Sequence, residues 1–168
     1  MNARQKIMFA NDETVDIGVG ENGRKETAEK LSEFLASTYT LCMKSLYFHW
    51  NVTGSEFHSL HEMFENQYND LVEASDDLAE RVRALGFYAP GSFKAFNRLS
   101  AVKDDENLPQ CSADMVQQLL DDHEVCSRQA RDVMKVAQTC GDEVTVGMVT
   151  DRMYKHEEAA WMLRATLN

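Results

Sequence analysis

This chain contains little proline and no long apolar stretch. Only two of its 168 residues are proline and 43% are hydrophobic, which suits one compact domain without a long structureless linker. No stretch of about 18 apolar residues offers a membrane span, and the first residues carry no apolar run long enough for a signal peptide. We therefore expect a cytoplasmic protein with no membrane partner, its association with the nucleoid being left open.

The cysteine pattern excludes two common kinds of site. Cys42, Cys111, Cys126 and Cys140 form no CxxC pair, and three of them fall on expected helices, so neither a zinc knuckle nor a disulfide framework is indicated. We expect reduced, partly buried thiols. The chain also lacks GxGxxG and P-loop patterns, so nucleotide chemistry has no support in the sequence.

Acidic residues outnumber basic ones, 28 to 17. The net charge is -11 and the sequence pI is near 4.8, which argues against a polyanion binder and favours cations as partners. Solubility alone is another explanation for the acidic residues, because a net charge keeps a protein in solution. The charges of residues 1–25 cancel, because four basic residues face four acidic ones: Arg4, Lys6, Arg24, Lys25, Asp12, Glu13, Asp16 and Glu21. No basic arm exists, so DNA binding is expected to be weak or absent.

Two long helices are predicted in the first half of the chain. Apolar residues recur at helical rather than strand spacing from Arg24 to Trp50, where glycine and proline are missing. The stop is predicted at residues 51–54, with Gly54 in the left-handed conformation and Ser55 as the next N-cap. The second helix then runs to Gly86 with apolar residues three and four apart.

The second half contains a crossover and two more helices. Residues 86–109 are too irregular for a main helix, but their short apolar stretch "FKAFNRLS" is consistent with a short one. Ser112 is expected to cap the third long helix, and the fourth follows Gly141. We therefore predict an all-α, ferritin-like four-helix bundle over residues 24–168, with a long crossover between helices two and three. Residues 1–23 form an N-terminal arm, either flexible or docked on a partner.

The second helix carries the residues that point to chemistry. His61 and Glu65 are four residues apart, as are Asp76 and Glu80, so each pair projects from one face of the helix. The four groups share a sector of about 100°, yet His61 and Asp76 are about 22 Å apart along the axis. One helix cannot close one site, but an antiparallel copy across a two-fold axis can, and this arrangement generates two equal sites per dimer. His49 is a candidate for an additional imidazole ligand.

These ligand types suit iron. Carboxylates with imidazoles bind Fe(II) and also hold Fe(III) once it forms, although zinc, manganese and cobalt compete. A conventional ferritin uses Glu-x-x-His pairs inside one bundle, and this chain has none, so iron chemistry is expected at a subunit interface. Taken singly, Glu65, Asp76 and Glu80 are each better explained as ordinary solvated helix residues, and only the combination with His49 and His61 favours a metal site. Of the remaining histidines, His58 and His123 are assigned to the exposed surface and His156 to the core.

The residues of this region are recognisable as a family pattern. "YTLCMKSLYFHWNVTGSEFHSLHEMFENQYNDLVEASDDLAERVRALG" resembles the first half of a Dps-type mini-ferritin, "KHEEAAWMLRATL" resembles its last helix, and the likeness covers residues 16–167. The resemblance assigns ferroxidase metal ligation to His49, His61, Glu65, Asp76 and Glu80. The family often has aspartate at the position of Glu65.

The resemblance further implies a hollow homo-dodecamer that oxidises Fe(II) with hydrogen peroxide in preference to dioxygen and stores a ferric mineral, protecting against oxidative damage. It also implies acidic pores at three-fold axes, for which Asp142, Glu143 and Asp151 are candidates; Gly147 stands where some relatives carry another acid. Helix capping is an equal alternative for Asp142. Trp50 follows His49 directly, and its role is packing or radical quenching near the site.

Two other functions remain open at this point. Some relatives condense DNA, so a DNA-compacting structural protein with secondary iron binding is one alternative. Twelve subunits would carry about -132 charges, however, and this field opposes a polyanion. A bundle that binds zinc or another divalent metal for non-redox purposes is the other alternative.

Overall fold

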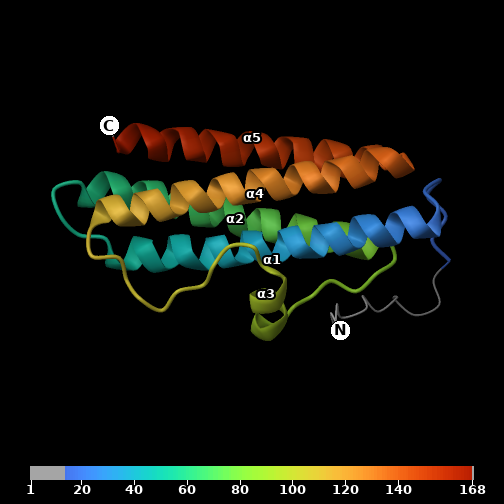
Figure 1. Cartoon of the computed structure of the whole chain (residues 1–168), viewed down its shortest axis with the longest axis horizontal. Coiled ribbons are helices and arrows are strands. Elements are labelled where there is room, and N and C mark those ends of the chain that lie inside the picture. The colour runs from blue at the N-terminus through green and yellow to red at the C-terminus, as the bar shows by residue number, and fades with distance from the viewer. Residues whose placement is uncertain (1–13, 168) are drawn as a thin grey trace.

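A computed structural model describes residues 14–167, which form four long helices and one short helix (Figure 1). Their bounds are α1 Glu21–Asn51, α2 Phe57–Ala84, α3 Phe93–Leu99, α4 Ser112–Cys140 and α5 Glu143–Thr166. The predicted all-α four-helix bundle with a short helix in the crossover is confirmed. The first 13 residues of the predicted N-terminal arm lie outside the described residues, and "VDIGVG" within it forms bends.

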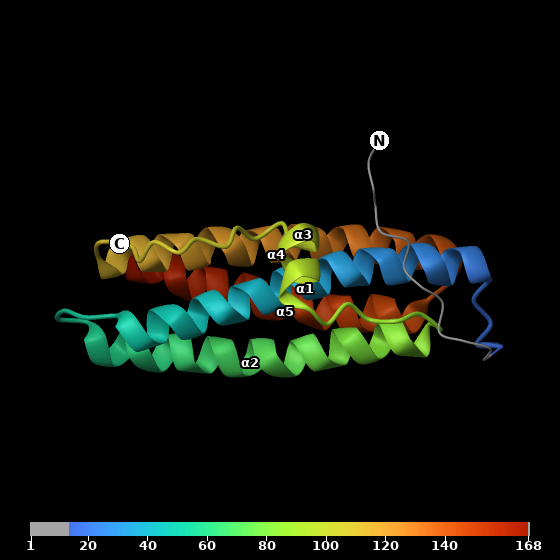
Figure 2. The same cartoon turned by 90° about the horizontal axis from the view of Figure 1, so that it is seen from below.

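The long helices form two antiparallel hairpins. The main contacts join α1 to α2, α4 to α5 and α1 to α4, while α3 packs on the outside of α1. Figures 1 and 2 show that α2 and α4 run in the same direction, so the crossover between them has to travel the length of the bundle. Residues 85–111 form this connection, and the only helix within them is the short α3.

The helix ends differ from the predicted ones by one to three residues. Gly54 has a positive φ of 107°, as expected, but the N-cap of α2 is Glu56 rather than Ser55. Likewise Ser112 is the first helical residue of α4 and Cys111 its N-cap. Helix α1 begins at Glu21, three residues before the predicted start, and includes Gly23. A Cβ at Gly23 would lie 2.4 Å from the Cβ of Cys140. The glycine therefore allows the ends of α1 and α4 to meet.

Charged side chains cross-link the middle of the bundle. Lys44 of α1 donates to Asp122 of α4 at 2.5 Å, and both side chains are about nine-tenths buried. Arg152 of α5 forms two hydrogen bonds with the carboxylate of Asp70 on α2, at 2.7 and 3.2 Å. These pairs connect all four long helices, and each buried cation has the carboxylate partner that burial requires.

Two histidines complete this buried polar centre. The Nδ1 atoms of His123 on α4 and His156 on α5 are 3.0 Å apart, so one ring donates to the other. The prediction that His156 lies in the core is confirmed, but the assignment of His123 to the surface was wrong, because only 3% of it is exposed. His123 can be buried because a second imidazole accepts or supplies its hydrogen bond.

The His123–His156 pair should make the fold sensitive to acid. Burial, followed by the positive charge of Arg152, lowers the pKa of His123 to about 3, and burial also lowers the pKa of His156. Unfolded histidines take up protons near pH 6.5, so the unfolded state binds more protons below that pH and the free energy of unfolding falls on acidification. The slope is at most about 1.4 kcal/mol per pH unit for each ring.

Urea unfolding of the metal-free protein between pH 7 and pH 4.5, at fixed protein concentration, measures this slope. Replacing both His123 and His156 by glutamine is expected to flatten it. His58→Gln provides the matched control, because the His58 side chain is 91% exposed. An unchanged slope in the double variant would remove the buried pair as the cause.

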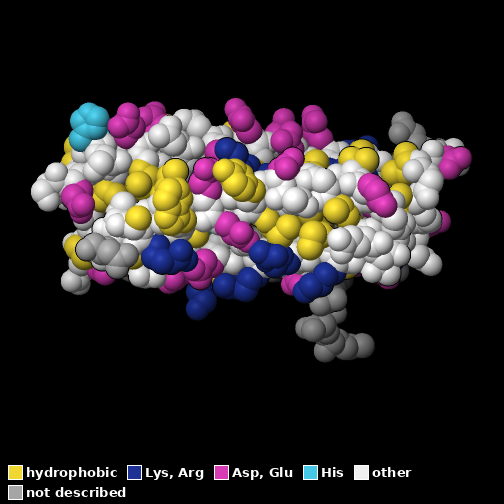
Figure 3. Space-filling model, turned by 90° about the horizontal axis from the view of Figure 1, so that it is seen from above, with side chains coloured by type: hydrophobic (Ala, Val, Ile, Leu, Met, Phe, Trp, Pro, Cys, Tyr) yellow, Lys and Arg dark blue, Asp and Glu magenta, His cyan; other side chains and the backbone are white. Residues whose placement is uncertain are grey.

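The outer surfaces of the bundle differ in character. In Figure 3, acidic side chains line the upper edge of the view, over α2, and hydrophobic side chains gather in the middle, over α5. The exposed hydrophobic residues of α5 include Tyr154 and Trp161.

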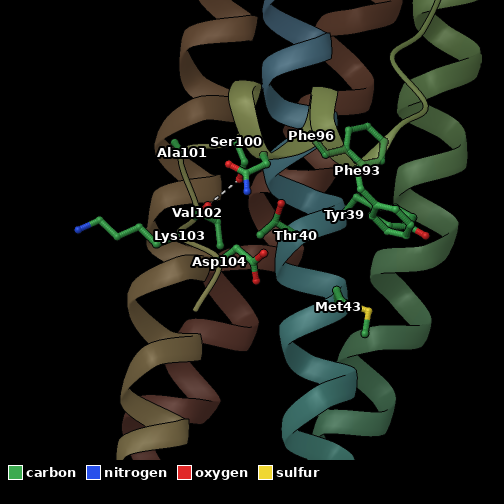
Figure 4. Close-up of a pocket in the computed structure, with 11 residues that line it drawn as sticks. Tyr39, Thr40, Met43, Phe93, Phe96, Ser100, Ala101, Val102, Lys103 and Asp104 are labelled. Carbon is green, nitrogen blue, oxygen red and sulfur yellow. Dashed lines mark hydrogen bonds between the residues drawn. The ribbon is translucent and has the colours of Figure 1, made fainter. Parts of the chain in front are cut away.

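A groove of about 410 Å³ lies between α1 and the crossover, and Figure 4 shows Tyr39, Phe93 and Phe96 on its wall. None of the five predicted metal ligands lines that groove. Among the described helices, none is long and apolar enough to cross a membrane.

Candidate metal site

The junction of α1 and α2 brings two predicted ligands into contact. His49 lies in the last turn of α1 and His61 in the second turn of α2, and residues 52–56 form the turn between the helices. The two rings stack with centroids 3.7 Å apart and planes 20° apart. His49 is 9% exposed and His61 is half-buried, so the pair lies where the protein surface meets the bundle interior.

Reciprocal hydrogen bonds set the tautomer of both rings. The Nδ1 of His49 is 2.8 Å from the backbone oxygen of His61, and the Nδ1 of His61 is 2.9 Å from that of His49. Since a carbonyl oxygen can only accept, each Nδ1 must carry the proton. With Nδ1 engaged in this way, Nε2 is the nitrogen of each ring that can bind a metal, in the arrangement that histidine ligands adopt in metal sites.

Glu65 follows one turn after His61 on α2 and is half-buried. Its Oε1 accepts a hydrogen bond from the hydroxyl of Tyr68 at 3.3 Å. The Tyr68 ring also meets His49 edge-on, with centroids 5.3 Å apart. Loss of solvent around this half-buried ring, followed by the charge of Glu65, raises the pKa of the Tyr68 phenol, so it stays a donor. Sequence reasoning missed Tyr68, although its i,i+3 spacing from Glu65 was visible.

Asp76 and Glu80 lie farther along α2 and are exposed. Figure 2 shows α2 as one continuous helix, so these carboxylates cannot approach the histidine pair of their own chain. Within residues 14–167, no group of three or more His, Cys, Asp or Glu side chains is placed to hold a metal ion. One chain thus brings His49, His61 and Glu65 to one region and leaves Asp76 and Glu80 in another.

The three pore candidates differ in exposure and in their hydrogen-bond partners. Glu143 and Asp151 are exposed on α5. Asp142 is only 2% exposed and is the N-cap of that helix, accepting from the backbone N–H and the hydroxyl of Thr145. Its carboxylate also binds Arg81 of α2 at 2.5 Å. The capping alternative therefore describes Asp142 in this chain.

Trp50, beside His49 in the sequence, points outward with 59% of its surface exposed. Packing within its own chain therefore does not account for it. The four cysteines are all free: Cys42 and Cys126 are buried, Cys140 is half-buried and Cys111 is exposed.

Comparison with known proteins places these features in a family. Residues 28–168 match the ferritin-like domain family. The chain is 32% identical over 142 residues to the DNA protection during starvation protein of Helicobacter pylori, covering 84% of this chain and 99% of the relative. DNA protection during starvation protein 2 of Bacillus anthracis is 31% identical, covering 86% and 98%.

A solved structure supports the same placement. The Dps protein of Vibrio cholerae O1, described as a member of a broad superfamily of ferritin-like diiron-carboxylate proteins, superposes with a TM-score of 0.87. It is 30% identical to this chain, and the match covers 94% of this chain and 99% of that one.

Proposed function

This chain belongs to the Dps proteins of the ferritin-like family, and we propose that it oxidises Fe(II) at sites shared between two subunits. The ferric product is stored inside a hollow homo-oligomer, a dodecamer. Hydrogen peroxide is the preferred oxidant, so the reaction removes peroxide and Fe(II) together and protects the cell from oxidative damage.

The observation that carries this proposal is the stacked His49–His61 pair. Both rings are held with Nδ1 on a backbone carbonyl, which leaves Nε2 as the available lone pair, as in histidine ligands of metal sites. In this proposal these two nitrogens and the Glu65 carboxylate, one turn after His61 on α2, make half of a mixed nitrogen and oxygen site. These ligand types suit Fe(II), with zinc, manganese or cobalt as competitors.

Asp76 and Glu80 of a partner subunit supply the other half in this proposal. An antiparallel pair of α2 helices related by a two-fold axis places the histidine end of one helix against the carboxylate end of the other. The carboxylates bring the negative charge that stabilises Fe(III) after oxidation. Each dimer then contains two equivalent sites.

The reaction balances with peroxide as the only oxidant. Two Fe(II) ions each lose one electron, and one hydrogen peroxide accepts both electrons and two protons to become two molecules of water. Fe(III) then hydrolyses to the stored mineral and releases protons. Because peroxide takes both electrons at one site, no hydroxyl radical needs to form.

DNA compaction is the less favoured function for this chain. The names of the curated relatives refer to DNA protection, but residues 1–25 carry no net charge and the whole chain carries -11. Phosphate contacts by lysine and arginine supply most of the affinity of non-specific DNA binding. Protection through removal of Fe(II) and peroxide needs no such contact.

The proposal predicts rapid Fe(II) oxidation by the assembled protein without oxygen. Wild-type apoprotein mixed with Fe(II) and hydrogen peroxide should develop ferric absorbance well above the rate in buffer. The variant with His61→Ala and Glu65→Ala should fall to the buffer rate, because two ligands are missing from every site.

The control variant carries His58→Ala and Glu62→Ala. This pair has the same residue types and the same i,i+4 spacing on the same helix, but its side chains are 91% and 65% exposed. It should oxidise Fe(II) as fast as wild type. Wild-type absorbance that rises no faster than in buffer would rule out the ferroxidase function.

A further inference from the structure

Tyr68 contacts one predicted ligand from each of two helices. Its hydroxyl donates to Oε1 of Glu65 on α2 at 3.3 Å, and its ring packs edge-on against His49 of α1, with an interplanar angle of 72°. None of the sequence patterns assigned it a role. Its position follows from helix geometry, because residues three apart on α2 lie over one another.

Glutamate at position 65 needs such a partner. Its side chain has three rotatable bonds, and a ligand that samples several rotamers binds a metal less tightly than one that is held in place. The Tyr68 hydroxyl engages Oε1, which leaves Oε2 and the second lone pair of Oε1 for a metal. An aspartate at this position would be shorter by one methylene, about 1.3 Å, and could not keep the 3.3 Å contact within hydrogen-bonding range.

We propose that Tyr68 is a positioning residue of the iron site, which orients the Glu65 carboxylate toward the metal while its ring supports His49. This inference rests on the proposed function. Tyr68 does not touch the metal and acts through Glu65, so the glutamate and the tyrosine work as one unit. The hydroxyl rather than the ring carries the effect on Glu65, and this separates positioning from simple packing.

A double-mutant cycle in the assembled protein tests this coupling, with Co(II) as a redox-inert probe followed by calorimetry and by its visible absorption. Tyr68→Phe keeps the ring and removes the hydroxyl, and it should weaken Co(II) binding about tenfold, as loss of an outer-shell partner commonly does. Glu65→Asp should weaken binding too. In the Glu65→Asp background, Tyr68→Phe should change the affinity by less than about twofold, because the contact is already lost.

Tyr154→Phe is the matched control. The Tyr154 hydroxyl also donates to a glutamate of its own helix, Glu158, at the same 3.3 Å, but it lies on α5. Its removal should leave Co(II) affinity and Fe(II) oxidation unchanged. With Tyr68→Phe, the Fe(II) concentration at half-maximal rate should rise about tenfold, with a smaller change in the maximal rate.

Two outcomes would overturn the positioning role while leaving the proposed function intact. One is a Tyr68→Phe variant that binds Co(II) as tightly as wild type. The other is an equal loss from Tyr68→Phe in the wild-type and Glu65→Asp backgrounds, which would mean that the hydroxyl acts independently of Glu65. A wild-type protein that neither binds Co(II) nor oxidises Fe(II) would instead reject the proposed function itself, and the positioning role with it.

Discussion

Two inactive variants, mixed and reassembled, are expected to regain about a quarter of the wild-type ferroxidase sites. One variant carries His61→Ala and Glu65→Ala, and the other carries Asp76→Ala and Glu80→Ala. Each alone should be inactive, because every site in its homo-oligomer lacks half of its ligands. This prediction follows from the separation of the two ligand pairs, about 22 Å along α2.

The recovered fraction follows from pairing statistics. Random association gives mixed dimers in half of all cases, and each mixed dimer has one site with both defects and one with both intact halves. An intrachain site gives no recovery, because neither chain contains a full ligand set. The ferric absorbance rate of the reassembled mixture therefore reports directly whether a site is shared.

Wild type taken through the same dissociation and reassembly provides the reference rate. The His58→Ala and Glu62→Ala variant, mixed with wild type, should show no loss. If the mixed variants stay inactive while the treated wild type recovers, the shared-site proposal is wrong, even if the protein is a ferroxidase.

The fold could be predicted from spacing, whereas helix ends could not be placed to the residue. Apolar positions such as Leu60, Phe64 and Leu71 recur at helical intervals and are all buried on α2, because one face of each helix must be covered. The exact N-caps depend on local backbone geometry that several residue types can adopt. This explains the one-residue errors at Ser55 and Ser112.

For His123, the polar residue type predicted an exposed position, whereas the helical periodicity predicts a buried one. It lies four residues after Leu119 and three before Cys126, both of which are fully buried on α4, so the helical period places it inside. Its residue type argued for the surface. The deciding factor is a partner 33 residues away, His156, and such a partner cannot be read from local sequence.

The candidate site divides in the same way. The four-residue spacing of His61 and Glu65 was enough to mark them as potential ligands. The stacking of His49 on His61 and the carbonyl acceptors that set both tautomers arise only when α1 and α2 pack. Which residues of a second chain complete the site is likewise a property of assembly, and it remains a proposal.

Asp142 illustrates a choice that only tertiary structure decides. Sequence position made it equally a pore carboxylate or a helix cap. In the fold it caps α5 through Thr145 and binds the Arg81 side chain, which is 10% exposed. Arg81 is 61 residues away in the sequence. A carboxylate with these partners contributes to stability, whereas the exposed Glu143 and Asp151 remain free for a role at a pore.

Asp142→Ala is therefore expected to lower the free energy of unfolding by about 3–5 kcal/mol, because it leaves the Arg81 guanidinium buried without its carboxylate and removes an N-cap. Asp142→Asn, which keeps the cap acceptor but not the charge, should lose less. Glu143→Ala should stay within about 0.5 kcal/mol of wild type. Urea unfolding at fixed protein concentration gives these values, and Fe(II) uptake by the folded variants is measured alongside. An Asp142→Ala protein that is as stable as wild type but takes up iron slowly would contradict the capping role and restore Asp142 to the pore.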